Sequence, residues 1–507
     1  MKAMKIKLMI TIAVTLLFSA ACTKLDEKLY DQVLATDYGK NDGEIQTIVG
    51  RAYASLRGFP NDGVVQSYPT CEYVYFLDEC CSDEACIPTR IGGDWDDQGR
   101  YRQAKYHTWN AANLMIVSSW RYHFIGIGKV NQVIYAIDHA TMADEAKTKI
   151  KAELRGVRAY YYLRLLDLFG NVPIVTDFAN TELPANSSRA DVYAFVESEL
   201  KAIMPDLSGN IIYGRITQNV ANTMLARLYL NSEVYLGTGH ARWQDCIDAC
   251  DRVTGYKIEP DFFTSFLTKN EVSQEIIFSI PYDGKQGTLG NYLSSMSFHY
   301  NQKWAFSATG NYQWSANGIC GTPGLYRFFD DKDVRKKSML AGLQNNKATG
   351  TPVLMANGNV LDYTDTIQDF TIALQNEGVR LKKYEVKEGE AWERDHDWVL
   401  MRYSEILLMK TECLIRLSSS ALAQPLIAQV RSRAGLDTPA EVDLQFLNDE
   451  LKREFLFEGH RRTDNIRFGT FFKEGWNQHV TPSYMGIFPI PNEEMAKNAN
   501  LVQNPGY

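Results

Sequence analysis

The sequence lacks the short motifs that mark most catalytic sites. It contains no GxSxG nucleophile elbow, no HExxH zinc helix and no phosphate-binding P-loop. Its eight histidines are scattered and show no metal-ligand spacing. A glycosidase needs two carboxylates roughly 5–10 Å apart, but the 61 acidic residues offer so many pairs that none is informative. We therefore predict that the chain is not an enzyme and needs no cofactor or metal.

Excess positive charge is also missing. The net charge is −8 at pH 7, whereas a nucleic-acid binder normally presents a basic face. The 45% hydrophobic and 22% charged residues are ordinary for a globular protein and exclude extensive disorder. A chain of 507 residues exceeds the usual size of one domain, so we expect one elaborate domain or two closely packed ones.

No hydrophobic run is long enough to cross a bilayer comfortably. The chain begins with three lysines and a short apolar run, and small residues then precede a cysteine: Lys2, Lys5, Lys7, Leu8 to Phe18, and Ser19-Ala20-Ala21-Cys22. This order is typical of a lipoprotein signal, although Ser19 stands where leucine is usual. We predict a signal peptide over 1–21, lipidation of Cys22 and a tether over 22–41. Plain secretion is the alternative.

Apart from Cys22 the sequence has eight cysteines, and four of them lie close together: Cys71, Cys80, Cys81 and Cys86. This cluster contains no CxxC pair and no histidine. In an exported protein such spacing permits local disulfides, and zinc binding is the less favoured alternative. Cys246 and Cys250 lie four residues apart on a predicted helix, where we expect buried thiols.

Apolar residues recur at helical intervals through much of the chain. Ser188 and Asp191 have the spacing of a capping box, and Ala226 and Ala249 would let two antiparallel helices approach closely. Such helix pairs resemble tetratricopeptide units, although the 34-residue period is absent. Helices are predicted over 44–56, 110–137, 153–169, from Ser188 through 200, 217–234, 243–253, 399–417, 421–433 and 444–457.

Two regions, 59–109 and 256–398, are too long to be simple connections. The second is rich in glycine, asparagine and aromatic residues, with strand-like pieces at 275–280 and 378–384. Long loops on a rigid scaffold usually carry function. The fold class is therefore mainly α, a tetratricopeptide-like helical scaffold with large loop-rich insertions that contain short strands.

Several segments, taken in order, resemble the SusD/RagB family of outer-membrane nutrient-binding lipoproteins. They are ELRGVRAYYYLRLLDLFGNVPIV at 153–175, ARLYL at 226–230, RYSEILL at 402–408, REFLFEGHRR at 453–462 with Asp464 and Arg467, and the ending PIP at 489–491 with QNPGY at 503–507. The resemblance implies a SusD-like domain over 42–507 whose insertions form the ligand face. It also implies a partner, a TonB-dependent transporter of the SusC type, over which the protein acts as a lid.

Most of these motif residues have a structural interpretation. Charges of alternating sign surround one helix end, and we predict that they form an ion-pair network: Arg453, Glu454, Glu458, Arg461, Arg462, Asp464 and Arg467. The run Tyr160-Tyr161-Tyr162 faces several sides of one helix, so at least one ring must be buried.

The candidate ligand residues lie in the two insertions. Aromatic rings suit the C–H faces of sugars, and Asp, Asn, Gln and Arg suit their hydroxyls. We expect Trp95, Trp304 and Trp314 to contact ligand, with Tyr312 and Asp96 behind them; the alternative for each indole is insertion core. Calcium binding by Asp94, Asp96 and Asp97 is a further alternative, but the DxDxDG spacing is missing.

The resulting prediction is a lipid-anchored outer-membrane protein, facing the cell exterior, that captures oligosaccharide or polysaccharide for the transporter. Peptide import on the same fold is the main rival, because peptide clefts also use Tyr and Trp. A surface adhesin is a third reading, and nucleic acid is not expected.

Overall fold

The computed structural model describes residues 42–58, 72–283, 291, 293–312, 315–389 and 395–507. Cys22, Cys71 and Trp314 lie outside the described residues. Within them, no helix combines the length and the apolar composition needed to cross a membrane.

The helices and strands follow one another in this order: α2 Asp42–Ala54, α3 Glu72–Cys80, β1 Ala85–Cys86, α4 Arg100–Tyr106, α5 Leu114–His139, α6 Asp144–Leu168, α7 Arg189–Ile203, α8 Gln218–Leu230, α9 Ser232–Leu236, α10 Trp243–Asp251, β2 Ile276–Ile280, α11 Leu293–Ser297, α12 Lys303–Phe306, β3 Cys320–Gly321, α13 Leu325–Phe328, β4 Met339–Leu340, β5 Gly342–Leu343, β6 Asp362–Tyr363, β7 Arg380–Leu381, β8 Trp398–Arg402, α14 Tyr403–Arg416, α15 Ser420–Arg433, α16 Leu444–Glu454, α17 Arg461–Arg467 and α18 Asn492–Lys497.

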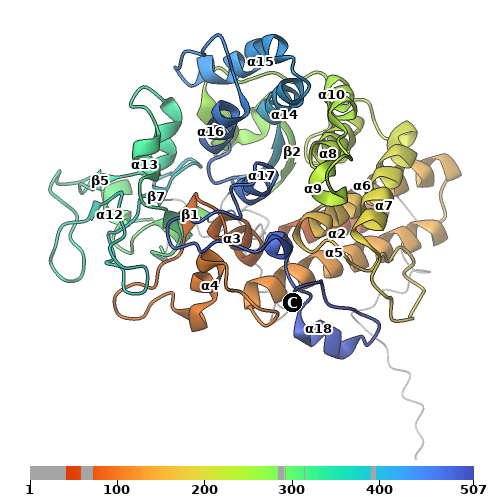
Figure 1. Ribbon diagram of the computed structural model, residues 1–507, viewed down its shortest axis with the longest axis horizontal. Coiled ribbons are helices and arrows are strands. Elements are labelled where there is room, and N and C mark those ends of the chain that lie inside the picture. Colours follow the sequence, from red (N-terminus) through yellow and green to blue (C-terminus); the bar gives the residue numbers. More distant parts are fainter. Residues whose placement is uncertain (1–41, 59–71, 284–290, 292, 313–314, 390–394) are drawn as a thin grey trace, which may run out of the picture.

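The scaffold is a series of packed helix pairs. Helix α6 packs between α5 and α7, α8 packs on α10, and α14 packs on both α10 and α15. Figure 1 shows these helices on one side of the molecule and along its top, with the strand-bearing insertion around β5, α12 and β7 on the other side. The predicted fold class is confirmed.

Local sequence signals explain several of these elements. Ser188 and Asp191 form the predicted capping box, each side chain accepting from the other residue's backbone N–H. Ala226 and Ala249 are fully buried in the packed pair α8 and α10, as their small side chains predict. All three rings of Tyr160-Tyr161-Tyr162 are buried.

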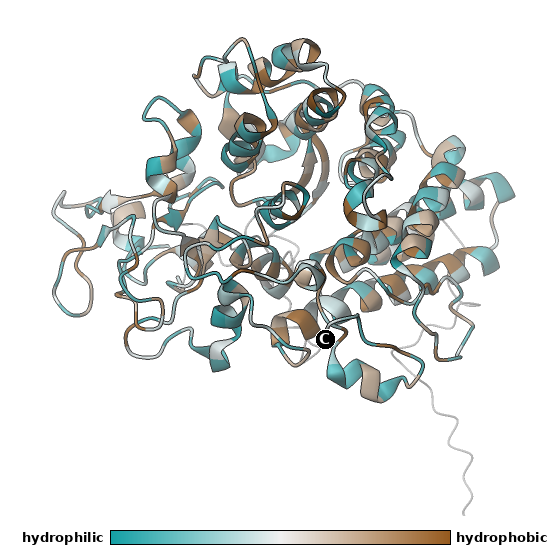
Figure 2. Cartoon of the chain, in the orientation of Figure 1, coloured by the Kyte–Doolittle hydropathy of each residue, from teal (hydrophilic) through white to brown (hydrophobic). Residues whose placement is uncertain are grey.

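Several helix boundaries differ from the prediction by a few residues, the helix predicted over 217–234 is divided into α8 and α9, and two differences at helix starts have a clear cause. Helix α6 starts at Asp144 rather than 153, because its first turns are largely exposed and polar and give little apolar periodicity. Residues 398–402 form strand β8 rather than the start of a helix. Their apolar run fits either structure, and antiparallel pairing with β2, which Figure 2 shows as a hydrophobic strand, decides between them.

The predicted local disulfides do not occur among the described cysteines. Cys80, Cys81 and Cys86 are buried free thiols. Cys80 ends α3, whereas Cys86 lies on β1 and faces β3, where its Sγ lies 3.9 Å from that of Cys320. Cys80 and Cys86 therefore lie on different elements and are not paired with each other. Cys246 and Cys250 are buried thiols, as predicted.

The predicted ion-pair network exists. Every one of its charges has a partner, and Arg461 reaches back to Asp83, Arg462 to Asp167 and Arg467 to Glu412: the full set is Arg453, Glu454, Glu458, Arg461, Arg462, Asp464 and Arg467. These pairs attach the C-terminal segment to α3, α6 and α14.

Glu454 lies in the most deeply buried part of this network. Its carboxylate pairs with Arg402, Arg433 and Arg335, and the side chains of all four residues are at most 3% exposed. Burial alone would raise the pKa of Glu454, but the three guanidinium groups outweigh it and hold that pKa well below its ordinary value.

Replacing Glu454 with Gln should destabilise the fold strongly. The change leaves three buried guanidinium groups short of one negative charge, which costs about 3–5 kcal/mol of unfolding free energy. Urea denaturation measures this loss. The control is Glu145→Gln, since Glu145 forms an exposed pair with Lys149 and its removal should leave the urea midpoint unchanged.

The depressed pKa of Glu454 also predicts how the stability of the fold changes with pH. A depressed pKa stabilises the folded state above the unfolded-state pKa, about 4.3 for glutamate, and this stabilisation is lost as the pH falls below that value. Wild type should therefore lose more stability than Glu454→Gln as the pH falls below about 4. Equal losses in the two proteins would contradict this role for Glu454.

Candidate functional site

The two insertions meet in one exposed surface, which we call the insertion face. It consists of residues 91–97 from the first insertion and residues 299–304 and 372–376 from the second. The Ile91 N–H donates to the Ala373 carbonyl at 2.8 Å, and the Tyr300 hydroxyl donates to the exposed Asp94 carboxylate. His299 Nε2 lies 3.1 Å from Gln375 Oε1. The first two bonds join segments more than 200 residues apart, and the third joins two segments of the second insertion.

Trp304 is the most exposed aromatic residue among the predicted ligand contacts that the structure describes. It lies on α12, and 37% of it is accessible. Gly310 packs directly against the indole: a Cβ atom there would lie 2.7 Å from Cζ3. The Lys303 ammonium lies 5.4 Å from the ring centroid. An indole supported by backbone, with a cation beside it, is suited to contact a sugar.

Trp95 joins the two insertions. Its Nε1 donates to the Ala316 carbonyl at 2.7 Å, and a Cβ on Gly318 would lie only 2.4 Å from its ring. The ring also packs on Phe76 and Tyr101 in the core. Trp95 is half-buried, so this position supports both of the alternatives weighed for it, insertion core and ligand contact.

The other predicted contacts are less accessible. Tyr312 is 7% exposed and packs on Phe298 and Phe306, which favours a packing role. Asp96 pairs with Arg102 at 2.9 Å, beside the face. Trp314 lies outside the described residues, so its contact with ligand stays a prediction.

Metal binding has no support in the geometry of this loop. Asp94 accepts from Tyr300, and Asp96 and Asp97 pair with Arg102 and Arg100. No group of three His, Cys, Asp or Glu side chains in the described ranges has an arrangement suited to a metal ion.

Two buried arginines behind the face were not predicted. Arg90 donates to the carbonyls of Asn317, Gly318, Leu374 and Glu377. Arg380 donates to the carbonyls of Gln375, Glu377 and Gly378 and to the Asn317 side chain; burial, followed by the charge of Arg90, lowers the pKa of Arg380 to about 10. Every residue has a backbone carbonyl, so the residue types in the sequence could not indicate which carbonyls these two arginines bond.

Two titratable groups of the face, Tyr300 and His299, are neutral at physiological pH. Burial, followed by its bond to Asp94, raises the pKa of Tyr300, so the hydroxyl remains a donor. Burial lowers the pKa of His299 to about 4, so its imidazole is uncharged. The accessible part of the face therefore combines an indole and a neutral hydroxyl with the Asp94 carboxylate and the Lys303 ammonium, and His299 is buried beneath it.

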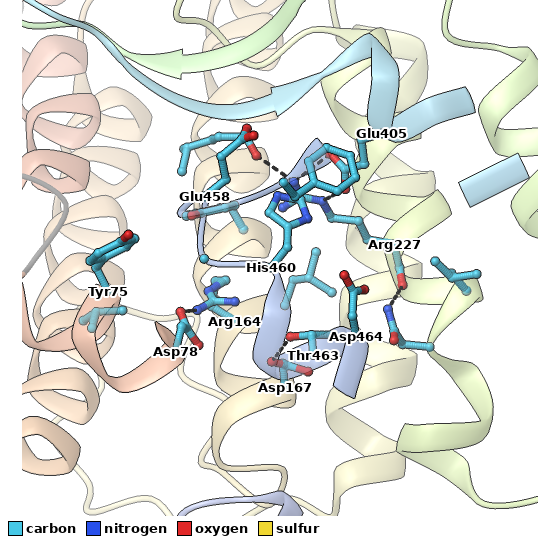
Figure 3. Close-up of a pocket in the computed structure, with 18 of the residues that line it drawn as sticks. Tyr75, Asp78, Arg164, Asp167, Arg227, Glu405, Glu458, His460, Thr463 and Asp464 are labelled. Carbon is cyan, nitrogen blue, oxygen red and sulfur yellow. Dashed lines mark hydrogen bonds and ion pairs between the residues drawn. The ribbon is translucent and has the colours of Figure 1, made fainter. Parts of the chain in front are cut away.

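A second candidate is a pocket of about 140 Å³ between the helices (Figure 3). In the close-up, Asp78 points toward Arg164, with which it pairs, and Arg227 pairs with Glu405. Burial, followed by the charge of Arg227, lowers the pKa of His460, which lies among them, well below its ordinary value. Charges paired in this way fix how the helices pack, because each is costly to leave unpaired, and the polar groups among the lining residues suit internal water.

Two family models match the chain. The model described as SusD family matches residues 274–486, and the one described as "Starch-binding associating with outer membrane" matches residues 91–230. The starch-binding protein SusD of Bacteroides thetaiotaomicron is 26% identical over 471 residues, which cover 82% of each chain. The two family models and this relative together support a SusD-family protein.

Solved structures show that the chain shares its fold with surface glycan-binding proteins of Bacteroides species. Surface glycan-binding protein A from Bacteroides uniformis has a TM-score of 0.74 at 20% identity, covering 92% of this chain and 99% of its own. The protein of the same name from Bacteroides thetaiotaomicron, solved in complex with laminarihexaose, has a TM-score of 0.72 at 22% identity, covering 91% and 99%.

Gly318→Ala should displace the Trp95 indole in this SusD-family chain. The new methyl group would overlap the ring at 2.4 Å, and overpacking of this kind costs about 1–3 kcal/mol. A lower melting temperature together with a shifted tryptophan emission spectrum would report the change. Gly128→Ala is the control, since a Cβ on this helical glycine meets nothing within 4 Å. A Gly318→Ala protein with unchanged stability and emission would contradict the assigned packing.

Proposed function

We propose that this protein captures oligosaccharide at the insertion face and delivers it to a TonB-dependent transporter of the SusC type. It is a binding protein rather than an enzyme. The observation that carries the proposal is the exposed Trp304 indole, which lies in the same segment as Tyr300, whose hydroxyl joins the two distant insertions through Asp94.

The chemistry of the face fits a glycan. A sugar ring presents a C–H face that packs on an indole and hydroxyl groups that need donors and acceptors at its edge. Trp304 supplies the ring, and Tyr300, Asp94, Asn301 and Gln375 supply exposed or partly exposed polar groups on the same face. The exposed Ile91, Ile372 and Leu374 add apolar area on the same surface.

The relatives support the same ligand class. One is named a starch-binding protein, and a solved neighbour with the same fold was crystallised with laminarihexaose. This support concerns the class of ligand, since the overall identities are 26% and 22%.

Lipidation of Cys22 would place the protein at the outer membrane, facing the cell exterior, with residues 22–41 as the tether. Several acyl chains on one cysteine anchor a protein firmly, whereas one chain binds a membrane only marginally. Tethering beside the transporter raises the effective concentration of the two proteins, so a weak sugar site can still supply the channel. The protein would then act as a lid that closes over captured glycan.

Trp304→Ala should weaken glycan binding without unfolding the protein. Aromatic contacts of this kind contribute about 0.5–1.5 kcal/mol, so the affinity should fall by up to about tenfold. The measurement is affinity gel electrophoresis of the detergent-solubilised protein against neutral and charged polysaccharides, followed by titration of the one that retards it. Phe178→Ala removes an equally exposed ring on the loop before α7 and serves as the matched control.

Retardation by a glycan that Trp304→Ala relieves and Phe178→Ala does not would support capture at this face. Retardation unaffected by Trp304→Ala would place the sugar elsewhere. If no polysaccharide retards the protein and a peptide mixture binds instead, peptide import replaces glycan import as its function.

A further inference from the structure

A groove of about 510 Å³ lies apart from the insertion face, between the scaffold helices and the C-terminal segment. It is lined by the ends of α8 and α14, by α9 and α17, by the start of α10 and by residues 483–487. Figure 1 shows α9 and α17 at the centre of the molecule, well separated from α12, which carries Trp304. A volume of this size lies within the range of small-ligand sites, about 300–1,000 Å³.

Aromatic side chains form part of the groove wall. Tyr484 is 38% exposed and packs edge-on against Tyr507, with ring centroids 5.0 Å apart. Trp243 is half-buried, and the Arg416 guanidinium lies 5.0 Å from its ring centroid. The groove therefore offers ring surfaces of the kind that contact sugars.

The charges of the groove wall are unbalanced toward positive. Arg189, Arg416 and Arg467 line it, against a single carboxylate, Glu233. Arg416 and Arg467 share the buried Glu412, which each approaches to 2.8 Å. The positive charges of Arg416 and Arg467 are therefore offset by a buried carboxylate.

Arg189 is not compensated in this way. It forms no ion pair with a carboxylate of the described residues; its Nη1 donates to the Val234 carbonyl at 2.9 Å, and its guanidinium stacks on Tyr235. Its Nε is buried and has no hydrogen-bond partner. Burial lowers the pKa of Arg189, so an anion bound beside it would recover the free energy lost on desolvation.

We propose that this groove is a second carbohydrate site, which binds a sugar unit carrying an anionic group, with Arg189 as the residue that recognises the anion. The group would be a carboxylate, as in a uronic acid, or a sulfate, because both accept the planar, forked hydrogen bonds of a guanidinium. The rings of Tyr484 and Trp243 line the same groove and would contact the sugar itself. The inference rests on the proposed function, since a glycan-capturing protein is what supplies such a ligand.

The test is isothermal titration of the full, detergent-solubilised protein with three probes: an oligogalacturonate, the same oligosaccharide after carboxyl reduction, and a sulfated oligosaccharide. We expect the carboxylated or the sulfated probe to bind at least tenfold more tightly than the reduced one, and the tighter of the two identifies the anion. Arg189→Met should weaken that binding by about tenfold or more, the loss expected for a charge-assisted hydrogen bond. Arg252→Met, at an exposed arginine just after α10, should leave it unchanged.

Ser483→Asp provides a second variant that does not disturb packing. Ser483 is exposed on the groove rim, so the change adds a negative charge beside the site and should also weaken anionic binding. Trp304→Ala, in contrast, should leave binding of the anionic probe intact.

Equal affinity for the acidic and the reduced probe would overturn the inference. Loss of acidic binding in Trp304→Ala, with Arg189→Met and Ser483→Asp unaffected, would also overturn it, by placing the acidic sugar on the insertion face. In both cases, binding of a neutral glycan that depends on Trp304 would leave the proposed function standing. Absence of binding to every glycan would instead reject the proposed function, and the second site with it.

Discussion

The Arg402 guanidinium joins several chain segments that are far apart in the sequence. It pairs with Glu275 before β2, with Glu454 at the end of α16 and with Glu458 in the turn that follows. Arg433 on α15 shares two of these carboxylates. Buried charges of this kind contribute little net stability compared with apolar packing, but each one is costly to leave unpaired. The network therefore acts mainly as a constraint, because other arrangements of these helices would strand a charge in the core.

A different kind of polar contact shapes the insertion face. Arg90 and Arg380 have no carboxylate partner in the described part of the chain, and they donate instead to the carbonyls of the loops that carry the face. One guanidinium has five donors in a rigid fork, so it can fix several turns of irregular backbone at once. The loops have only short stretches of ladder hydrogen bonds, and these two side chains supply further bonds between them. Ion pairs therefore fix how the scaffold helices are arranged, whereas hydrogen bonds from arginines to backbone carbonyls fix the loops of the insertion face.

The helical scaffold could be predicted from the sequence because packed helices leave a repeating apolar pattern, and the ordered family motifs supplied its class. The pattern failed at β8, where Val399 and Met401 fit helix or strand and a distant partner decides. At the site, Trp304 and Trp95 could be placed in the correct loops by composition. Their exposure could not be predicted, because it depends on close contacts with Gly310 and Gly318 that no local sequence pattern indicates. Tyr312 shows the same limit, because its neighbours, not its residue type, bury it.

The backbone of the first insertion adds a consequence for how the face works. Trp95, Asp97 and Gln98 all have positive φ angles, of 63°, 43° and 59°, in a region that residues with side chains rarely adopt. Each such residue costs about 1–3 kcal/mol and persists only where its surroundings determine it. Here the packing of the Trp95 indole and its hydrogen bond to the Ala316 carbonyl hold the loop in this conformation. A loop already specified by its own packing has little conformational entropy left to lose when a ligand arrives. The loop would therefore behave as a preformed template, selecting glycans whose free shape already matches it rather than moulding itself around many.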